Sequence, residues 1–170
     1  MVWWSTLQLR SNNAEVRRKA LEHLAVTRNA DALELLLAGL RDDNPQVRCA
    51  AIRGLGQIKD DQVVTALTDA LHDPESDVRQ AAASGLGQLG DATVASRLAV
   101  LLSDRNAGVR ASTAAALQSL GWKPSTNEEQ VQFDIALGRT LAATFAGQAG
   151  VKALVAELKH DTSFKRRAAA

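Results

Sequence analysis

The segment DPESDVRQAAASGLGQLGDA at residues 73–92 nearly repeats the segment DDNPQVRCAAIRGLGQIKDD at residues 42–61. The two segments start 31 residues apart, and the same step recurs in both directions along the chain. Three columns keep this step through four copies: Val16, Val47, Val78, Val109; Arg17, Arg48, Arg79, Arg110; and Leu24, Leu55, Leu86, Leu117. A period between about 20 and 50 residues is typical of solenoids, in which repeats stack on one another.

Each copy predicts a pair of helices. In the second copy, the apolar residues of the first helix fall at helical spacing: Val47, Ala51, Ile52, Leu55 and Ile58. Asn44 can cap this helix, and Pro45 suits its first position. The tract KDDQ at 59–62 then ends the stripe, and Asp60 or Asp61 can cap a second helix whose inner face holds Val64, Leu67, Thr68 and Leu71. One such hairpin cannot bury its apolar stripes alone, so we expect the copies to share a continuous core.

The pattern D-x-x-x-x-V-R-x-A-A-x-x-G-L-G-Q-[IL] resembles the HEAT repeat, of the short type found in phycobilisome-lyase-like proteins, over about residues 11–120. The resemblance implies an all-α fold, a right-handed α-solenoid of stacked helical hairpins whose Val-Arg helices line the concave face. It also implies a ladder, within and between repeats, in which aspartates pair with arginines: Asp42, Asp73 and Asp104 with Arg48, Arg79 and Arg110. The first copy departs from the pattern, because Ser11 stands in the aspartate place.

We expect residues 1–170 to form a single HEAT-repeat domain, with repeats starting near residues 11, 42, 73 and 104. The period breaks after Leu120, and a helical insertion is predicted at about 121–146, where Thr126 and Glu129 have capping-box spacing. This insertion resembles one seen in prokaryotic HEAT proteins. A partial last repeat is predicted at 147–170, which suggests a piece of a longer protein. Near the start, Trp3 and Trp4 fit either a short helix covering the first repeat or a contact with a partner or membrane surface.

The composition argues against several classes of partner. Twenty basic residues balance 19 acidic ones, so no strong field favours nucleic acid. No apolar run approaches the roughly 18 residues of a membrane helix, and we expect no membrane association. The single cysteine, Cys49, suits a reducing compartment, and we expect a cytoplasmic protein.

The chain shows no converging catalytic groups in its sequence. His23, His72 and His160 sit at different places in their repeats, so stacking does not gather them. Deoxyhypusine hydroxylase, an enzyme built on similar repeats, binds iron through His-Glu pairs, but Cys49-Ala50 and Gln80-Ala81 stand in the corresponding places here. No zinc spacing, P-loop or nucleophile elbow occurs. The sequence therefore predicts no catalytic residue, metal or cofactor, and a protein that is not an enzyme.

The exposed positions of the Val-Arg helices differ between repeats, whereas the inner stripe is constant. Such variation on a shared scaffold suits an extended recognition surface. We expect the concave-face residues that bind a protein or peptide partner to be Arg18, Glu22, Cys49, Arg53, Gln57, Gln80, Ser84, Gln88 and Ser119. The predicted function is a non-catalytic interaction scaffold or regulatory module. The alternative is a bilin lyase-type subunit acting on a chromophore-carrying protein, because such subunits share the repeat.

Overall fold

The computed structural model describes residues 2–27 and 30–139 of the 170-residue chain, without the side chains of residues 2–4, 27, 30 and 31. Its helices are α1 (Val2–Gln8), α2 (Ala14–Thr27), α3 (Ala30–Gly39), α4 (Pro45–Leu55), α5 (Asp61–Ala70), α6 (Ser76–Leu89), α7 (Ala95–Ala99), α8 (Ala107–Ser119) and α9 (Asn127–Ala136). The 3-10 turns η1 (Ala92–Val94) and η2 (Val100–Ser103) flank α7. No strand occurs in these two ranges.

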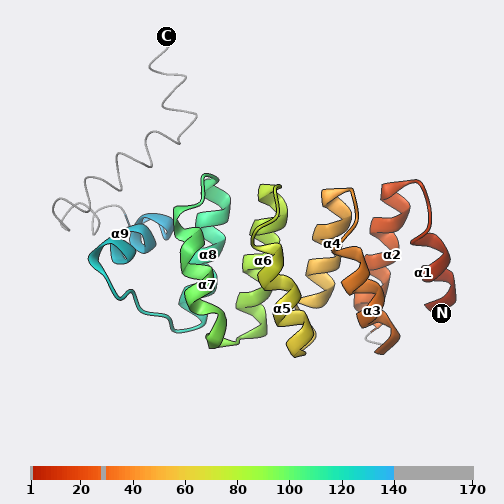
Figure 1. Ribbon diagram of the computed structural model, residues 1–170, viewed down its shortest axis with the longest axis horizontal. Coiled ribbons are helices and arrows are strands. Elements are labelled where there is room, and N and C mark those ends of the chain that lie inside the picture. Colours follow the sequence, from red (N-terminus) through yellow and green to blue (C-terminus); the bar gives the residue numbers. More distant parts are fainter. Residues whose placement is uncertain (1, 28–29, 140–170) are drawn as a thin grey trace, which may run out of the picture.

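The helices form two rows that run the length of the molecule (Figure 1). The Val-Arg helices α2, α4, α6 and α8 make one row, in which each helix contacts the next, and α3, α5 and α7 make the other. The first row starts at Ala14, Pro45, Ser76 and Ala107, which keeps the 31-residue step of the sequence. Helix α1 packs on α2 and α3 at one end, and α9 packs on α8 at the other. The predicted all-α solenoid of stacked hairpins is confirmed.

The core lies between the two rows and follows the predicted columns. Leu24, Leu55, Leu86 and Leu117 of the Val-Arg helices are at most 1% exposed. Leu36, Leu67 and Leu98 of the second helices are fully buried against them. Since each leucine is buried by its own hairpin and by the neighbouring one, the stability of the solenoid depends on the interfaces between repeats.

Asparagine side chains cap most of the Val-Arg helices. Asn44 accepts a hydrogen bond from the backbone N–H of Gln46 at 2.9 Å, and Asn106 accepts one from Gly108 at 2.8 Å. Glu75 occupies the same place at the start of α6 with nearly the same backbone angles, but its side chain makes no capping bond. Helix α6 therefore begins without a side-chain cap.

Arginine–aspartate pairs join successive repeats along the turns. In each pair the arginine Nε and one terminal nitrogen donate to both carboxylate oxygens, and we call the set the Arg–Asp ladder. Its pairs are Arg17–Asp42, Arg48–Asp73 and Arg79–Asp104, with Nε–Oδ2 distances of 2.7, 2.8 and 2.8 Å. Every pair spans 25 residues and so ties one repeat to the next. The predicted ladder between repeats is confirmed.

The contact within each repeat differs from the expected ion pair. Arg48 donates through Nη1 to the backbone carbonyl of Asp42 at 2.7 Å, while the Asp42 carboxylate receives Arg17. Because this contact uses a carbonyl, the residue six positions before the arginine needs no acidic side chain. Arg17 accordingly donates to the carbonyl of Ser11 at 2.8 Å, so the serine leaves the first repeat intact.

Helix α9 lies within the part of the predicted insertion that the structure describes, residues 121–139. Thr126 accepts from the backbone N–H of Glu129, whose carboxylate accepts from the backbone N–H of Thr126, which confirms the capping box at the start of α9. Phe133 packs edge-on against Trp122, with ring centroids 5.4 Å apart. The predicted partial repeat at 147–170 lies outside the described residues.

The third second-row helix differs from its prediction. The expected continuous helix is divided into η1, α7 and η2, although Asp91 caps its start and Val94, Leu98 and Leu102 remain buried. The apolar spacing is thus satisfied by a mixture of α and 3-10 turns.

Candidate functional site

A groove of about 580 Å³ runs between α4 and α6 on the Val-Arg side of the molecule, and we call it the polar groove. Its floor is made of small residues, because the two helices approach closely there. A Cβ on Gly56, just beyond the end of α4, would lie 3.1 Å from the Cα of Gly85, so glycine suits this tight approach of the two backbones. Long polar side chains then form the walls on either side.

The structure brings six of the nine predicted site residues together around this groove. They are Cys49 and Arg53 from α4, Gln57 from the turn that follows this helix, and Gln80, Ser84 and Gln88 from α6. The six come from two repeats and from places that are equivalent under the 31-residue step. Whether they bind a partner stays a prediction.

Two polar residues of the groove were missed at the sequence level. Gln46 and Asp77 line it one helical turn before Cys49 and Gln80. They belong to a further column at the repeat step, which also holds Glu15 and Gly108. This column could have been found by extending the exposed face one turn towards the helix N-terminus.

Arg53 is the cation among the described residues that line the groove, and Asp77 is the carboxylate. The Arg53 side chain is 59% exposed, and a terminal nitrogen lies 3.8 Å from a carboxylate oxygen of Glu22. An ion pair this long and this exposed contributes little to stability. The guanidinium is therefore available to an incoming ligand.

Cys49 differs from the expected exposed position. It is only 4% exposed and belongs to the floor of the groove. Burial raises the pKa of its thiol, and the thiolate is correspondingly disfavoured at neutral pH.

Two of the remaining predicted residues are held by ion pairs on α2. Arg18 donates to both carboxylate oxygens of Glu15 and also to Glu22. The hydrogen bond from Arg18 lowers the pKa of Glu15 to about 2. Arg18 lines a separate hollow between α2 and α4, so it extends the polar surface without joining the groove.

Ser119, the last predicted residue, lies on α8 beyond the groove. Its hydroxyl donates to the carbonyl of Ala116 at 2.8 Å and lies 3.4 Å from the carbonyl of Gly87 on α6. The serine is exposed but already engaged with the backbone.

The described residues contain no group of three or more His, Cys, Asp or Glu side chains arranged to hold a metal ion. Among the helices that the structure describes, none has both the length and the apolar character needed to cross a membrane.

The model of the family described as HEAT repeats matches residues 5–84 and 65–133, which together are more than half of the chain. The chain belongs to the HEAT-repeat family. No curated protein sequence matches it significantly. The matched residues include the four Val-Arg helices and the three pairs of the Arg–Asp ladder.

Solved structures share this HEAT fold over nearly the whole chain. The complex of CpcE and CpcF of phycocyanin lyase from Nostoc sp. PCC7120 matches with a TM-score of 0.62 at 21% identity, covering 96% of this chain and 89% of the other. Human deoxyhypusine hydroxylase matches with a TM-score of 0.59 at 21% identity, covering 96% and 69%. An engineered protein matches with a TM-score of 0.52 at 19% identity, covering 91% and 78%.

These neighbours correct one prediction. The expectation that this HEAT protein is not an enzyme is wrong, because its structural neighbours include a phycocyanin lyase and a hydroxylase. Both neighbours are named as enzymes and share this fold, so the fold gives no reason to exclude catalysis here. At these identities the likeness establishes the fold alone.

Proposed function

We propose that this HEAT-repeat chain is a binding module that holds a protein partner along the polar groove between α4 and α6. The observation that carries the proposal is the convergence of variable polar residues from two repeats around one groove. Glutamine side chains both donate and accept hydrogen bonds, as the backbone of a partner does. Arg53 adds a guanidinium that can bind a carboxylate of the partner through two parallel bonds.

The shape and chemistry of the groove favour an elongated polar segment. The floor is shallow and small-sided, and the walls carry amides, a hydroxyl and two opposite charges. Pockets for compact small molecules are mostly apolar and enclose most of the ligand, which this groove does not do. The balanced charge of the whole chain gives no electrostatic support for nucleic acid as the ligand.

We place the module in the cytoplasm, because its single cysteine has no disulfide partner within the chain.

The test compares two double variants with equal change in net charge. Arg53→Glu with Gln88→Glu alters both walls of the groove, whereas Arg97→Glu with Ser96→Glu alters exposed positions of α7 on the other row. A partner captured from the source organism by the unmodified chain is then titrated with each variant by calorimetry. We expect the groove variant to bind at least about tenfold more weakly, since a like charge replaces a favourable contact, and the α7 variant to bind within about twofold. Equal binding by both variants, or weakening by the α7 variant alone, would place the partner elsewhere.

A second candidate function is that of a lyase-type subunit acting on a chromophore-carrying protein. It is favoured by the fold shared with the phycocyanin lyase complex over 96% of this chain. Incubation of the chain with a free bilin, followed by addition of a carrier protein, separates the two candidates. A shift of the bilin absorbance on mixing supports the lyase-type role, and an unchanged spectrum supports binding of the protein partner alone.

A further inference from the structure

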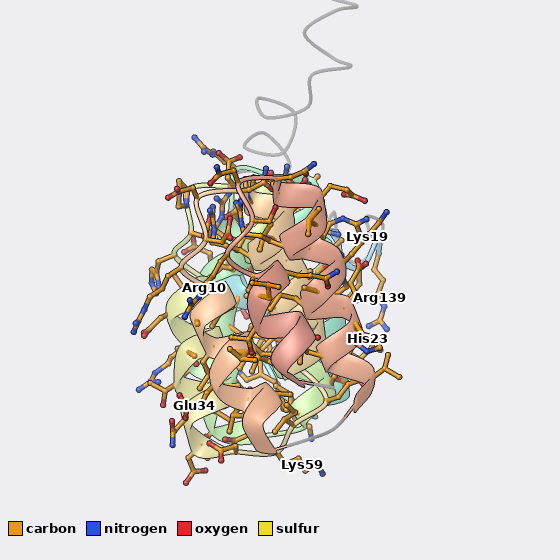
Figure 2. The ribbon with its side chains drawn as sticks, turned by 90° about the vertical axis from the view of Figure 1, so that its right-hand side faces the viewer. Arg10, Lys19, His23, Glu34, Lys59 and Arg139 are labelled. Atoms are coloured by element: carbon orange, nitrogen blue, oxygen red, sulfur yellow. The ribbon has the colours of Figure 1, made fainter. Side chains whose placement is uncertain are left out.

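A larger hollow, of about 810 Å³, lies between α3 and α5 in the second row of helices. Figure 2 shows Glu34, which lines this hollow, on the side of the molecule opposite to Lys19 and His23 of α2. The hollow shares no lining residue with the polar groove and is separate from it. We call it the acidic trough, for its unpaired carboxylates, which are Glu34, Asp61 and Asp69.

The two walls of the trough are helical stripes. Helix α3 contributes Glu34 and Ala38, and Arg41 lies just beyond its end, four and seven residues after Glu34. Helix α5 contributes Asp61, Thr65 and Asp69, each one turn further along. Because α3 and α5 occupy the same place in successive repeats, they run in the same direction. The trough is thus a channel between two helices of the same direction.

The charges of the trough differ from those of the turns. The carboxylates of the Arg–Asp ladder are each bound by an arginine. Glu34, Asp61 and Asp69 are exposed instead, and none makes an ion pair with another residue in the described part of the chain. Arg41 and His72 lie at one end of the trough. An excess of unpaired negative charge therefore remains along its walls.

The floor of the trough is apolar. It is formed by half-buried or buried side chains: Leu37, Leu40, Ala66, Ala70 and Val78. Asp61 and Asp69 stand eight residues apart on α5, which corresponds to about 12 Å along the helix axis. A partner helix lying in the channel would present a cation at a similar distance after two turns, with its apolar stripe on the floor.

We propose that the acidic trough between α3 and α5 binds a basic amphipathic helix of a partner protein. The apolar stripe of that helix covers the leucine and alanine floor, and its lysines or arginines pair with the carboxylates of the walls. The mode is that of a helix in a groove, with charge complementarity selecting basic over acidic partners. This surface is independent of the polar groove, so two partners can be bound on opposite sides of one module.

The probe is a synthetic, fluorescein-labelled 15-residue amphipathic peptide with a leucine and alanine stripe and lysines at positions 4, 8 and 12. Its comparison peptide carries glutamate at the same three positions. Binding to the whole chain is measured by fluorescence anisotropy at low and at physiological salt. We expect the lysine peptide to bind at least about tenfold more tightly than the glutamate peptide, with the difference shrinking as salt rises.

Two variants with equal change in net charge then locate the site. Glu34→Gln, Asp61→Asn and Asp69→Asn together remove the unpaired carboxylates of the trough. Glu15→Gln, Glu75→Gln and Glu128→Gln together remove as many charges from places that do not line it. We expect the first variant to bind the lysine peptide at least about fivefold more weakly, because it loses three exposed ion pairs with the peptide. The second variant should bind it less than about twofold more weakly.

A neutral substitution keeps the test decisive if the triple variant folds poorly. Ala38 is exposed on the wall, so Ala38→Gln fills part of the trough without changing its charge. This variant should also bind the lysine peptide about fivefold more weakly. Three results would overturn the proposal: equal binding of the two peptides, equal weakening by the two triple variants, or no binding of the lysine peptide at millimolar concentration.

Discussion

The Arg–Asp ladder makes a definite prediction at Arg79, the most buried of its arginines. The Arg79 side chain is 9% exposed and its partner Asp104 is 10% exposed. Nε and Nη2 donate to the Asp104 carboxylate at 2.8 and 3.1 Å, and Nη1 donates to the carbonyls of Asp73 and Pro74 at 2.8 and 3.0 Å. Three nitrogens thus hold four acceptors, half of them in the next repeat.

The substitution Arg79→Lys keeps the charge and tests the geometry. One ammonium cannot reach the carboxylate and the two carbonyls together, so about two charge-assisted hydrogen bonds are lost. Each is worth about 1.5–3 kcal/mol, and water recovers part of the loss, so we expect the free energy of unfolding to fall by about 2–4 kcal/mol. The matched control is Arg53→Lys, where the ion pair with Glu22 is long and exposed, and the change should stay within about 0.5 kcal/mol.

Urea unfolding followed by circular dichroism at 222 nm and by tryptophan fluorescence measures both variants. The two probes must give coincident transitions, because repeat proteins can unfold in parts. If Arg79→Lys costs no more than Arg53→Lys, the four bonds at Arg79 do not hold the repeats together, and the ladder is not a source of stability.

Three further predictions concern stability. Glu75→Asn should raise the free energy of unfolding by about 1 kcal/mol in urea titrations, because the backbone at Glu75 already matches that at the capping Asn44; an unchanged midpoint would refute this. Thr113 is fully buried, and its hydroxyl has no hydrogen-bond partner in the described part of the chain. Thr113→Val should therefore raise the melting temperature. A lower melting temperature would contradict this, because it would mean that the hydroxyl makes a stabilising hydrogen bond. The hydrogen bond from Arg17 holds the pKa of Asp42 below its usual value. The ionised Asp42 carboxylate therefore contributes stability above about pH 4, and this contribution is lost as pH falls through the lowered pKa. The unfolding midpoint of Asp42→Asn should accordingly depend less on acid pH than that of the unmodified chain.

The polar groove was largely predictable from the sequence, whereas the acidic trough was not predicted. Exposed positions of a helix follow from its apolar stripe, so the repeat pattern alone places Arg53, Gln57 and Gln88 on one face. The pattern places Cys49 on that face too, but the close approach of α4 and α6 buries it. How far a side chain at the edge of a face is covered depends on the distance between helices, which the period of a sequence does not specify.

The sequence by itself determined the repeat length, the paired helices, the caps at Asn44 and Thr126, and the leucine columns of the core. The caps and apolar stripes depend on hydrogen bonds and spacing within about ten residues, and the repeat length follows from like residues 31 positions apart, so all are visible along the chain. The tertiary structure decided which carboxylate each ladder arginine binds, since Arg48 pairs with Asp73 of the next repeat and takes only a carbonyl from Asp42. It also decided that α3 and α5 leave a channel with unpaired carboxylates between them. Both outcomes depend on the distance and angle at which one hairpin packs on the next, and that geometry is set by side chains meeting across the interface.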